Sequence, residues 1–461
     1  MTDLLPLLLG AGLLAAPAHA QPLGAGGGGP VFASSEEDEP DKELDSETER
    51  PVEGATNRAL GEAANDPSLK EALSALYDLD YEKTQTLAFR FIRSHPENPF
   101  GHLFAAGALW WEVSAEAGSV QHPKALSERF DELVEGTLKK AKVLMKSKDA
   151  RERPDGYFAA GMVLGLRGQW KLAGGEWMSA YRDGKKAIKY LRKCVKLDPG
   201  YADAYMGLGI FDYQTAKLPA ILRMGAKILF RGVGDSRRGL ERIRLAVDKG
   251  RFSNQQAMSF LLTLMVLYEK DYPQGLELSR QLRRDFPDSP YYAFAESVLL
   301  GAMGDQAGSY QTALDLFAKG GRTPESLWMK QKGIVCGLAG ALCLEPQHVE
   351  AAARWLDVAI SSATAVSERA SPRSRQRGIK AAPEAPLPPR WFTLLHFYRG
   401  LAHDLLTERR AAVEEYDTVL ELADLGHAQA WARYCREVPC DRAQADAILG
   451  GQPAPALPIK R

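Results

Sequence analysis

The sequence has few of the features that identify many enzymes and membrane proteins. It contains no run of about 20 apolar residues, so no segment predicts a helix that crosses a bilayer. The metalloprotease motif H-E-x-x-H, the nucleophile motif G-x-S-x-G and the phosphate-binding motif G-x-x-x-x-G-K-[ST] are all missing. We therefore predict no catalytic residues, no cofactor and no enzymatic activity.

Cysteine is also scarce, with five among 461 residues, which is too few for a fold built on disulfides. No C-x-x-C pair occurs, so the sequence predicts neither a zinc site nor a thioredoxin-type redox site. His396 and His403 would lie about 10 Å apart on one helix, and without further ligands they do not form a metal site. Cys435 and Cys440 are close enough in the chain to form a disulfide after export.

The small net charge of −1 conceals an uneven distribution. Residues 1–66 hold 13 acidic and 3 basic side chains, a net charge of −10. The rest of the chain, with 55 basic and 46 acidic side chains, carries +9. An acidic arm on a basic body can stay solvated, or it can fold back onto the body and screen it. The sequence leaves both arrangements open.

The N-terminus is typical of an exported protein. Residues 1–20, MTDLLPLLLGAGLLAAPAHA, contain a leucine-rich stretch and end in A-x-A, although Asp3 stands where a basic residue is usual. We interpret them as a cleaved signal peptide, which predicts a protein of the periplasm or cell envelope. Residues 21–66, first glycine-rich and then acidic, are predicted to be a disordered linker. An exported protein seldom meets nucleic acid, so nucleic acid is not a predicted partner.

From residue 67 onward the apolar spacing is helical, and one type of helix ending recurs. Three predicted helices close with a short polar turn that contains proline: RSHPENP, KLDPGYADA and RDFPDSPYY. In each case a small residue precedes the proline by 12 positions, and the pairs are Thr84 and Pro96, Ala187 and Pro199, and Gly275 and Pro287. A small residue lets two helices approach closely, and proline ends the second of them.

This pattern resembles the tetratricopeptide repeat family, whose unit is a helix-turn-helix of about 34 residues. Tyr205, Leu208 and Gly209 match the family's first helix, and Ala412 and Tyr416 match its second. The chain is thereby identified as a divergent, exported, bacterial-type member. The resemblance implies an all-α fold, in which helix-turn-helix repeats stack as a right-handed α-solenoid over residues 67–435. We expect insertions near 167–182, 217–234 and 371–390, and a C-terminal loop and tail over 436–461.

The same resemblance implies a function. Such a protein is a non-enzymatic scaffold or adaptor for protein–protein interaction, and the concave face made by its first helices binds a peptide or a partner helix. Where the repeat register is clear, the concave positions are Asp203, Met206, Ile210, Tyr213, Leu394, Phe397, Leu401 and Asp404. The identity of the protein partner does not follow from the sequence.

The segment KLPAILRMGAKILFRGVG, residues 217–234, allows a second function. As a helix it is amphipathic, with Arg223, Lys227 and Arg231 four residues apart on the polar side. Such a helix packs on the solenoid, docks on a partner, or lies on an anionic membrane. The alternative function is therefore that of a peripheral membrane protein that uses residues 217–231.

Four tryptophans lie in the first half of the repeat region, at positions 110, 111, 170 and 177. They either line a groove or fill the wedges between helix pairs. Filling is the commoner use of large aromatic side chains in stacked helices, so we predict that these residues are packed in the interior.

Overall fold

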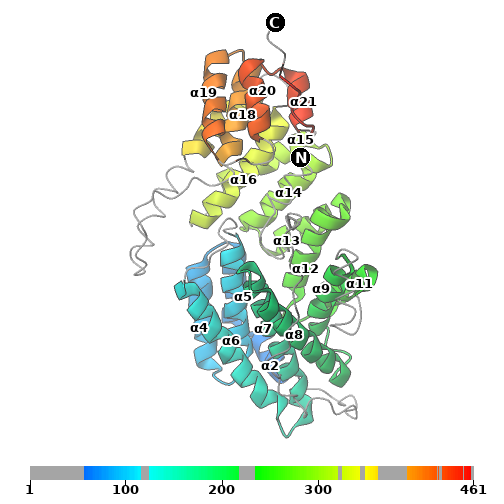
Figure 1. Ribbon diagram of the computed structural model, residues 1–461. Helices are drawn as coiled ribbons and strands as arrows, with labels where there is room; N and C mark the ends of the chain where they lie inside the picture. Colours follow the sequence, from blue (N-terminus) through cyan, green and yellow to red (C-terminus); the bar gives the residue numbers. More distant parts are fainter. Residues whose placement is uncertain are drawn as a thin grey trace.

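The computed structural model describes residues 57–115, 124–217, 234–319, 324–342, 348–361, 392–422, 424, 428–449 and 451–457. Within these ranges the chain forms helices joined by turns, and it contains no β-strand. Helices that follow one another in the sequence pack against one another (Figure 1). The fold is an all-α stack of helix pairs, as the sequence pattern predicted.

The pairs follow in chain order after a short first helix. A 3-10 turn, η1 (Ala150–Glu152), leads into α7, and a π-helical turn, η2 (Met265–Glu269), follows α12. The helices are α2 (Arg58–Asn65), α3 (Pro67–Tyr77) with α4 (Tyr81–Ser94), α5 (Phe100–Ala115) with α6 (Lys124–Met145), α7 (Arg153–Ala173) with α8 (Trp177–Leu197), α9 (Ala204–Lys217) with α11 (Ser236–Lys249), α12 (Asn254–Leu264) with α13 (Tyr272–Asp285), α14 (Pro290–Ala302) with α15 (Gln306–Ala318), then α16 (Pro324–Ala341), α18 (Phe392–Leu405) with α19 (Arg409–Glu421), and finally α20 (Ala428–Glu437), which packs on α19, and α21 (Arg442–Leu449). Residues 348–361 are also helical.

Small residues lie where paired helices cross. Gly209 of α9 faces Gly239 of α11. A Cβ added to Gly239 would lie 2.7 Å from the backbone nitrogen of Tyr213 and 2.9 Å from the Gly209 carbonyl oxygen. A side chain does not fit at these distances, so glycine permits the two helices to pack this closely. Ala187 and Ala412, selected from the sequence for the same role, are buried in their pairs.

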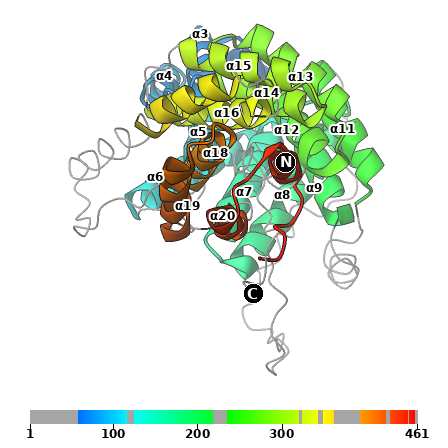
Figure 2. The same ribbon diagram turned by 90° about the horizontal axis from the view of Figure 1, so that it is seen from above.

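The stack turns back on itself, so that its first helices contact its middle. The Ser289 hydroxyl donates a hydrogen bond of 2.7 Å to the backbone oxygen of Tyr77, 212 positions away in the chain. The ring centroid of Tyr77 lies 4.7 Å from that of Phe286, and the centroids of Trp111 and Tyr291 are 5.5 Å apart. The view in Figure 2 shows the helices following a curved path. These contacts belong to one apolar core that includes residues from α2 to α16.

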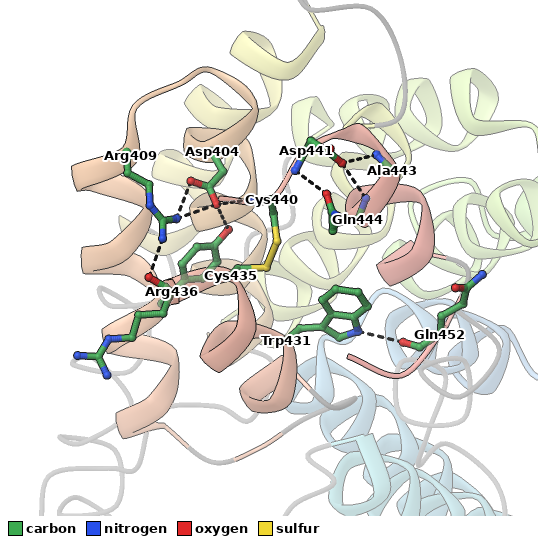
Figure 3. The surroundings of a disulfide bond; sticks show 11 residues. Asp404, Arg409, Trp431, Cys435, Arg436, Cys440, Asp441, Ala443, Gln444 and Gln452 are labelled. Atoms are coloured by element: carbon green, nitrogen blue, oxygen red, sulfur yellow. Dashed lines mark hydrogen bonds and ion pairs between the residues drawn. A yellow bond between two sulfur atoms is a disulfide. The ribbon is translucent and has the colours of Figure 1, made fainter. Parts of the chain in front are cut away.

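The C-terminal pairs have a second apolar core, which includes residues from α16 to α21. Here a disulfide joins Cys435 of α20 to Cys440, as the spacing of these cysteines predicted (Figure 3). The buried carboxylate of Asp404 accepts hydrogen bonds from the Cys440 amide and from Arg409, both at 2.9 Å, and one from the Tyr416 hydroxyl at 3.1 Å. Asp404 thus connects α18, α19 and the turn that follows α20.

Three predicted boundaries differ from the structure. The linker was placed up to residue 66, but α2 begins at Arg58 and buries Leu60, because its first amides donate to the carboxylate of Asp155. Residues 167–182, predicted as an insertion, form the end of α7 and the start of α8. The predicted C-terminal loop and tail contain α21, which buries Ala445 in the second core. The signal peptide, residues 218–233 and residues 371–390 lie outside the described residues.

Candidate functional site

The side chains assigned to a concave binding face are interior residues. Met206 and Tyr213 are part of a small core in which residues of α9, α11 and α12 meet. The prediction of a partner-binding face is therefore wrong for the seven buried positions, which are used for packing between neighbouring helices, and it stays a prediction for Ile210. The buried residues are Asp203, Met206, Tyr213, Leu394, Phe397, Leu401 and Asp404, and Ile210 is half-buried.

Asp203 shows what an acidic residue does in this interior. Its carboxylate accepts hydrogen bonds from the backbone amides of Arg251, Phe252 and Ser253 at 2.7–3.1 Å, and from the Ser253 hydroxyl at 2.9 Å. These groups immediately precede α12, so the carboxylate lies at the end of that helix where a negative charge is favourable. Asp203 joins α9 to α12 and is not available to a partner.

The tip of the α7–α8 pair exposes two large apolar side chains. Residues 174–176 form the turn between the helices, and Gly175 takes a positive φ of 82°. Immediately after the turn, Trp177 is 59% exposed and Met178 is 63% exposed. The prediction of interior packing holds for Trp111 and Trp170, which are buried, and is wrong for Trp177. An exposed tryptophan beside an exposed methionine is typical of a contact surface.

The solvent side of α8 is basic over most of its length. At 100° per residue its exposed cations fall within an arc of about 120°, and Met178 lies on the same arc. The one acidic residue of this helix, Asp183, is buried. We call the exposed cations the α8 basic face, and they are Arg182, Lys185, Lys186, Lys189, Arg192 and Lys196.

Asp183 does not neutralise the α8 basic face, because its carboxylate pairs with cations of α7 between the two helices. Arg167 donates to its carboxylate at 2.7 and 2.8 Å, and Lys171 donates at 2.9 Å. Burial alone would raise the pKa of Asp183, but the hydrogen bonds and charges of Arg167 and Lys171 outweigh it and lower the pKa. The carboxylate therefore stays ionised and paired between the two helices.

A cluster of arginines extends the α8 basic face toward α9 and α11. The buried carboxylate of Asp212 accepts two hydrogen bonds from Arg238, at 2.9 and 3.0 Å, and one from Arg242 at 2.5 Å. Arg192 lies close by, with its guanidinium carbon 5.9 Å from the ring centroid of Phe211. Burial and the charges of Arg242 and Arg238 lower the pKa of Arg192, and the charge of Asp212 opposes this. Three guanidinium groups here surround one carboxylate, which leaves an excess of positive charge.

The α8 basic face was not among the predicted sites, although its signal is present in the sequence. Lysine and arginine recur at helical spacing from position 182 to 196. The spacing predicts that these cations face solvent, but it does not tell that Asp183 is buried and paired with cations of α7. The segment with Arg223, Lys227 and Arg231, for which contact with an anionic membrane was the alternative to packing on the solenoid or docking on a partner, lies outside the described residues, so its role stays a prediction.

The histidines near the C-terminus have carboxylate partners. His396 lies 2.7 Å from Glu415, and His403 lies 2.6 Å from Glu408. Among the residues that the structure describes, no group of three or more His, Cys, Asp and Glu side chains could hold a metal ion. The helices within the described ranges include none with the length and apolar character needed to cross a membrane.

The fold places this chain among helical-repeat proteins, in which helix pairs stack in sequence order. No family model and no curated protein matches the sequence. Among solved structures the chain is similar to the one titled "Crystal Structure of the Yeast Tom70", over 83% of this chain and 89% of that chain. The sequence identity is 13% and the TM-score is 0.32. Similarity of this size supports no inference about function.

Proposed function

We propose that this protein is a divergent tetratricopeptide-repeat scaffold of the cell envelope, without enzymatic activity, that binds an acidic segment of a partner protein along the α8 basic face. One observation carries the proposal. The exposed side of α8 presents six basic and no acidic side chains, and the helix begins with the exposed Trp177 and Met178. Stacked helix pairs provide the rigid support that such a surface needs. The signal-like residues 1–20 support the location.

The shape of the face favours an extended polypeptide over a membrane. Its cations are distributed along the helix, and the large apolar side chains stand at one end only. If the tip inserted into a bilayer, Lys189 would lie about 18 Å and Lys196 about 28 Å along the helix axis from Trp177. Both distances exceed the Debye length of about 8 Å at physiological salt, so these charges would gain little from anionic head groups. A polypeptide that runs along α8 would contact the whole face.

The proposed partner segment is acidic over about four turns and has an apolar residue at one end. Its carboxylates would pair with the lysines and arginines, and its apolar side chain would cover Trp177 and Met178. Each exposed ion pair contributes at most about 1 kcal/mol, so affinity depends on several pairs together and falls with salt. The buried concave residues have no part in this contact.

The experiment measures binding of a fluorescein-labelled peptide of ten glutamates followed by leucine and phenylalanine, by fluorescence anisotropy at low salt. The protein is the full chain with the acidic side chains of residues 36–49 changed to amides, so that its own arm does not compete. We expect the triple variant Arg182→Glu, Lys185→Glu and Lys189→Glu to weaken binding at least tenfold. A matched variant with three other exposed lysines changed to glutamate, Lys139 and Lys142 of α6 and Lys146 directly after it, should bind within twofold of the parent chain.

Equal loss in the α6 variant, or no loss in the α8 variant, would show that the α8 basic face is not the binding surface. Sedimentation with anionic vesicles tests the alternative function. Vesicle binding that is lost when Arg223, Lys227 and Arg231 become glutamate, without any peptide binding, would support the membrane function instead. Export predicts that the mature protein from its source cells begins at Gln21, which N-terminal sequencing checks.

A further inference from the structure

The acidic arm enters the folded body at one end of the α8 basic face. The side-chain amide of Asn57 donates a hydrogen bond of 3.0 Å to Asp198, the residue that follows α8. The next residues are also held there, since Arg58 pairs with Glu152 at 2.9 Å and α2 donates two amides to Asp155. The chain that precedes residue 57 therefore starts next to Asp198, at the C-terminal end of α8, where Lys196 is the last cation of the face.

The sequence of the arm matches the face in charge. Residues 36–49 hold nine acidic side chains and one basic side chain. They also contain one leucine, Leu44. A stretch with a net charge of −8 thus lies seven residues from Asn57, which contacts Asp198 at the C-terminal end of α8. No other segment of this composition occurs in the sequence.

The arm is long enough to cover the face. From Lys196 to Arg182 the helix axis runs about 21 Å, at 1.5 Å per residue. Residues 36–49 span up to about 46 Å when extended, and residues 50–56 add up to about 23 Å. Leu44 is 13 residues from Asn57, a reach of about 43 Å, whereas Met178 is about 30 Å along α8 from Asp198. The leucine can therefore reach the exposed apolar end while the carboxylates lie beside the cations.

We propose that residues 36–49 occupy the α8 basic face in the free protein and compete with the acidic partner for it. The competition with a partner rests on the proposed function, whereas the contact between residues 36–49 and α8 does not. A tether of seven residues gives the arm an effective concentration in the millimolar range. Contacts with an intrinsic Kd of about 1 mM are then enough for half occupancy, which several exposed ion pairs supply. The arm acts as an internal competitor that a tighter-binding partner displaces.

The contact is tested on the full chain with a water-soluble carbodiimide, which joins carboxylates to amines that touch them. Mass spectrometry should find links from the arm to Lys185, Lys186, Lys189 and Lys196 at low salt. We expect the links to disappear at 1 M salt, where the Debye length is about 3 Å. For a matched pair of variants, Arg182→Glu with Lys185→Glu should remove the links to the remaining lysines, and the same two changes at Lys139 and Lys142 of α6 should not.

The outcomes separate the contact from its alternatives. Links spread equally over α6 and α8, or no links at all, would overturn the proposal. Links found only in covalent dimers would mean that the arm of a second copy occupies the face, which also overturns it. Links to α8 in the monomer, sensitive to salt and to the α8 variant alone, would support it.

The consequence for function has its own measurement. The chain with its nine arm carboxylates changed to amides should bind the glutamate peptide at least twofold more tightly than the unmodified chain, because release of a half-occupied face doubles the apparent affinity. If both chains bind it equally and no links form, the arm proposal fails and the proposed function stands. If links form but the amide variant binds no acidic peptide, the arm contact stands and the proposed function fails. The nine changes are Glu36→Gln, Glu37→Gln, Asp38→Asn, Glu39→Gln, Asp41→Asn, Glu43→Gln, Asp45→Asn, Glu47→Gln and Glu49→Gln.

Discussion

Replacement of Asp203 by alanine tests whether this residue stabilises the fold or binds a partner. The repeat pattern predicted that Asp203 contacts a partner on the concave face. Four donors lose their acceptor in this variant. The amide and hydroxyl of Ser253 are buried, and each costs about 1–3 kcal/mol when left without a partner. The amides of Arg251 and Phe252 are only partly buried and can regain water. We therefore expect a loss of about 4 kcal/mol in the free energy of unfolding.

Asp203→Asn should cost about half as much, because the amide oxygen still accepts a hydrogen bond while the negative charge beside α12 is lost. A stack of repeats need not unfold in one step, so the measurement must be local. Hydrogen exchange followed by mass spectrometry, on peptides that cover residues 236–264, reports the opening of α11 and α12. A loss of about 4 kcal/mol corresponds to roughly a thousandfold faster exchange where opening limits it.

Asp248, an exposed carboxylate of α11, provides the matched control. Asp248→Ala should exchange at the rate of the unchanged chain. The reasoning would be refuted if Asp203→Ala were as stable as Asp248→Ala. It would be refuted more strongly if Asp203→Ala kept its stability and lost the acidic peptide, because Asp203 would then face the partner.

Two further predictions concern the crossing of α9 and α11 at Gly239 and the buried carboxylate of Asp155, which accepts the first amides of α2. Gly239→Ala should lower the free energy of unfolding by about 2 kcal/mol or more, because its Cβ meets the backbone of α9. Gly184→Ala in α8 has open space around its Cβ and should raise the free energy of unfolding by about 0.5–1 kcal/mol. Hydrogen exchange on peptides from α11 and from α8 compares each variant with the unchanged chain. Burial raises the pKa of Asp155 to about 6 from 3.8, so its folded form binds a proton that the unfolded form releases. The stabilising contribution of Asp155 is then complete below about pH 4 and is lost, by up to about 3 kcal/mol, as the pH rises to 7. In Asp155→Asn the free energy of unfolding should therefore fall less between pH 4 and pH 7, by that same amount.

Much of the architecture could be predicted because repeats leave local marks. A small residue followed by a proline 12 positions later, as in Ala187 and Pro199, predicts a helix that crosses its partner at the small residue and ends before the proline. Gly209 and Gly239 carry the same information, since close backbone approach requires residues without bulk. The disulfide between Cys435 and Cys440 was predictable because the two cysteines are only five positions apart.

The candidate site could not be predicted in the same way. The family pattern assigned Met206 and Leu401 to a concave face, but the stack curves until Tyr77 meets Phe286, and each pair also covers part of its neighbour. The curvature is the sum of small rotations between pairs, and no single pair encodes it. The spacing of the cations in the α8 basic face could be seen in the sequence. Only the structure showed that Asp183 is buried, so that the exposed side of α8 carries no acidic residue.

By itself, the sequence of this protein determined the all-α class, the order of the helix pairs, the crossing residues, the disulfide and the unequal charge of arm and body. These features depend on residues close together in the chain, or on composition. Only the tertiary structure decided which faces remain exposed, that most of the expected concave residues are interior, and that Asn57 lies against Asp198 at the end of α8. Exposure depends on contacts between residues far apart in the chain, such as Ser289 with Tyr77 and Asn57 with Asp198, and local spacing carries no information about them.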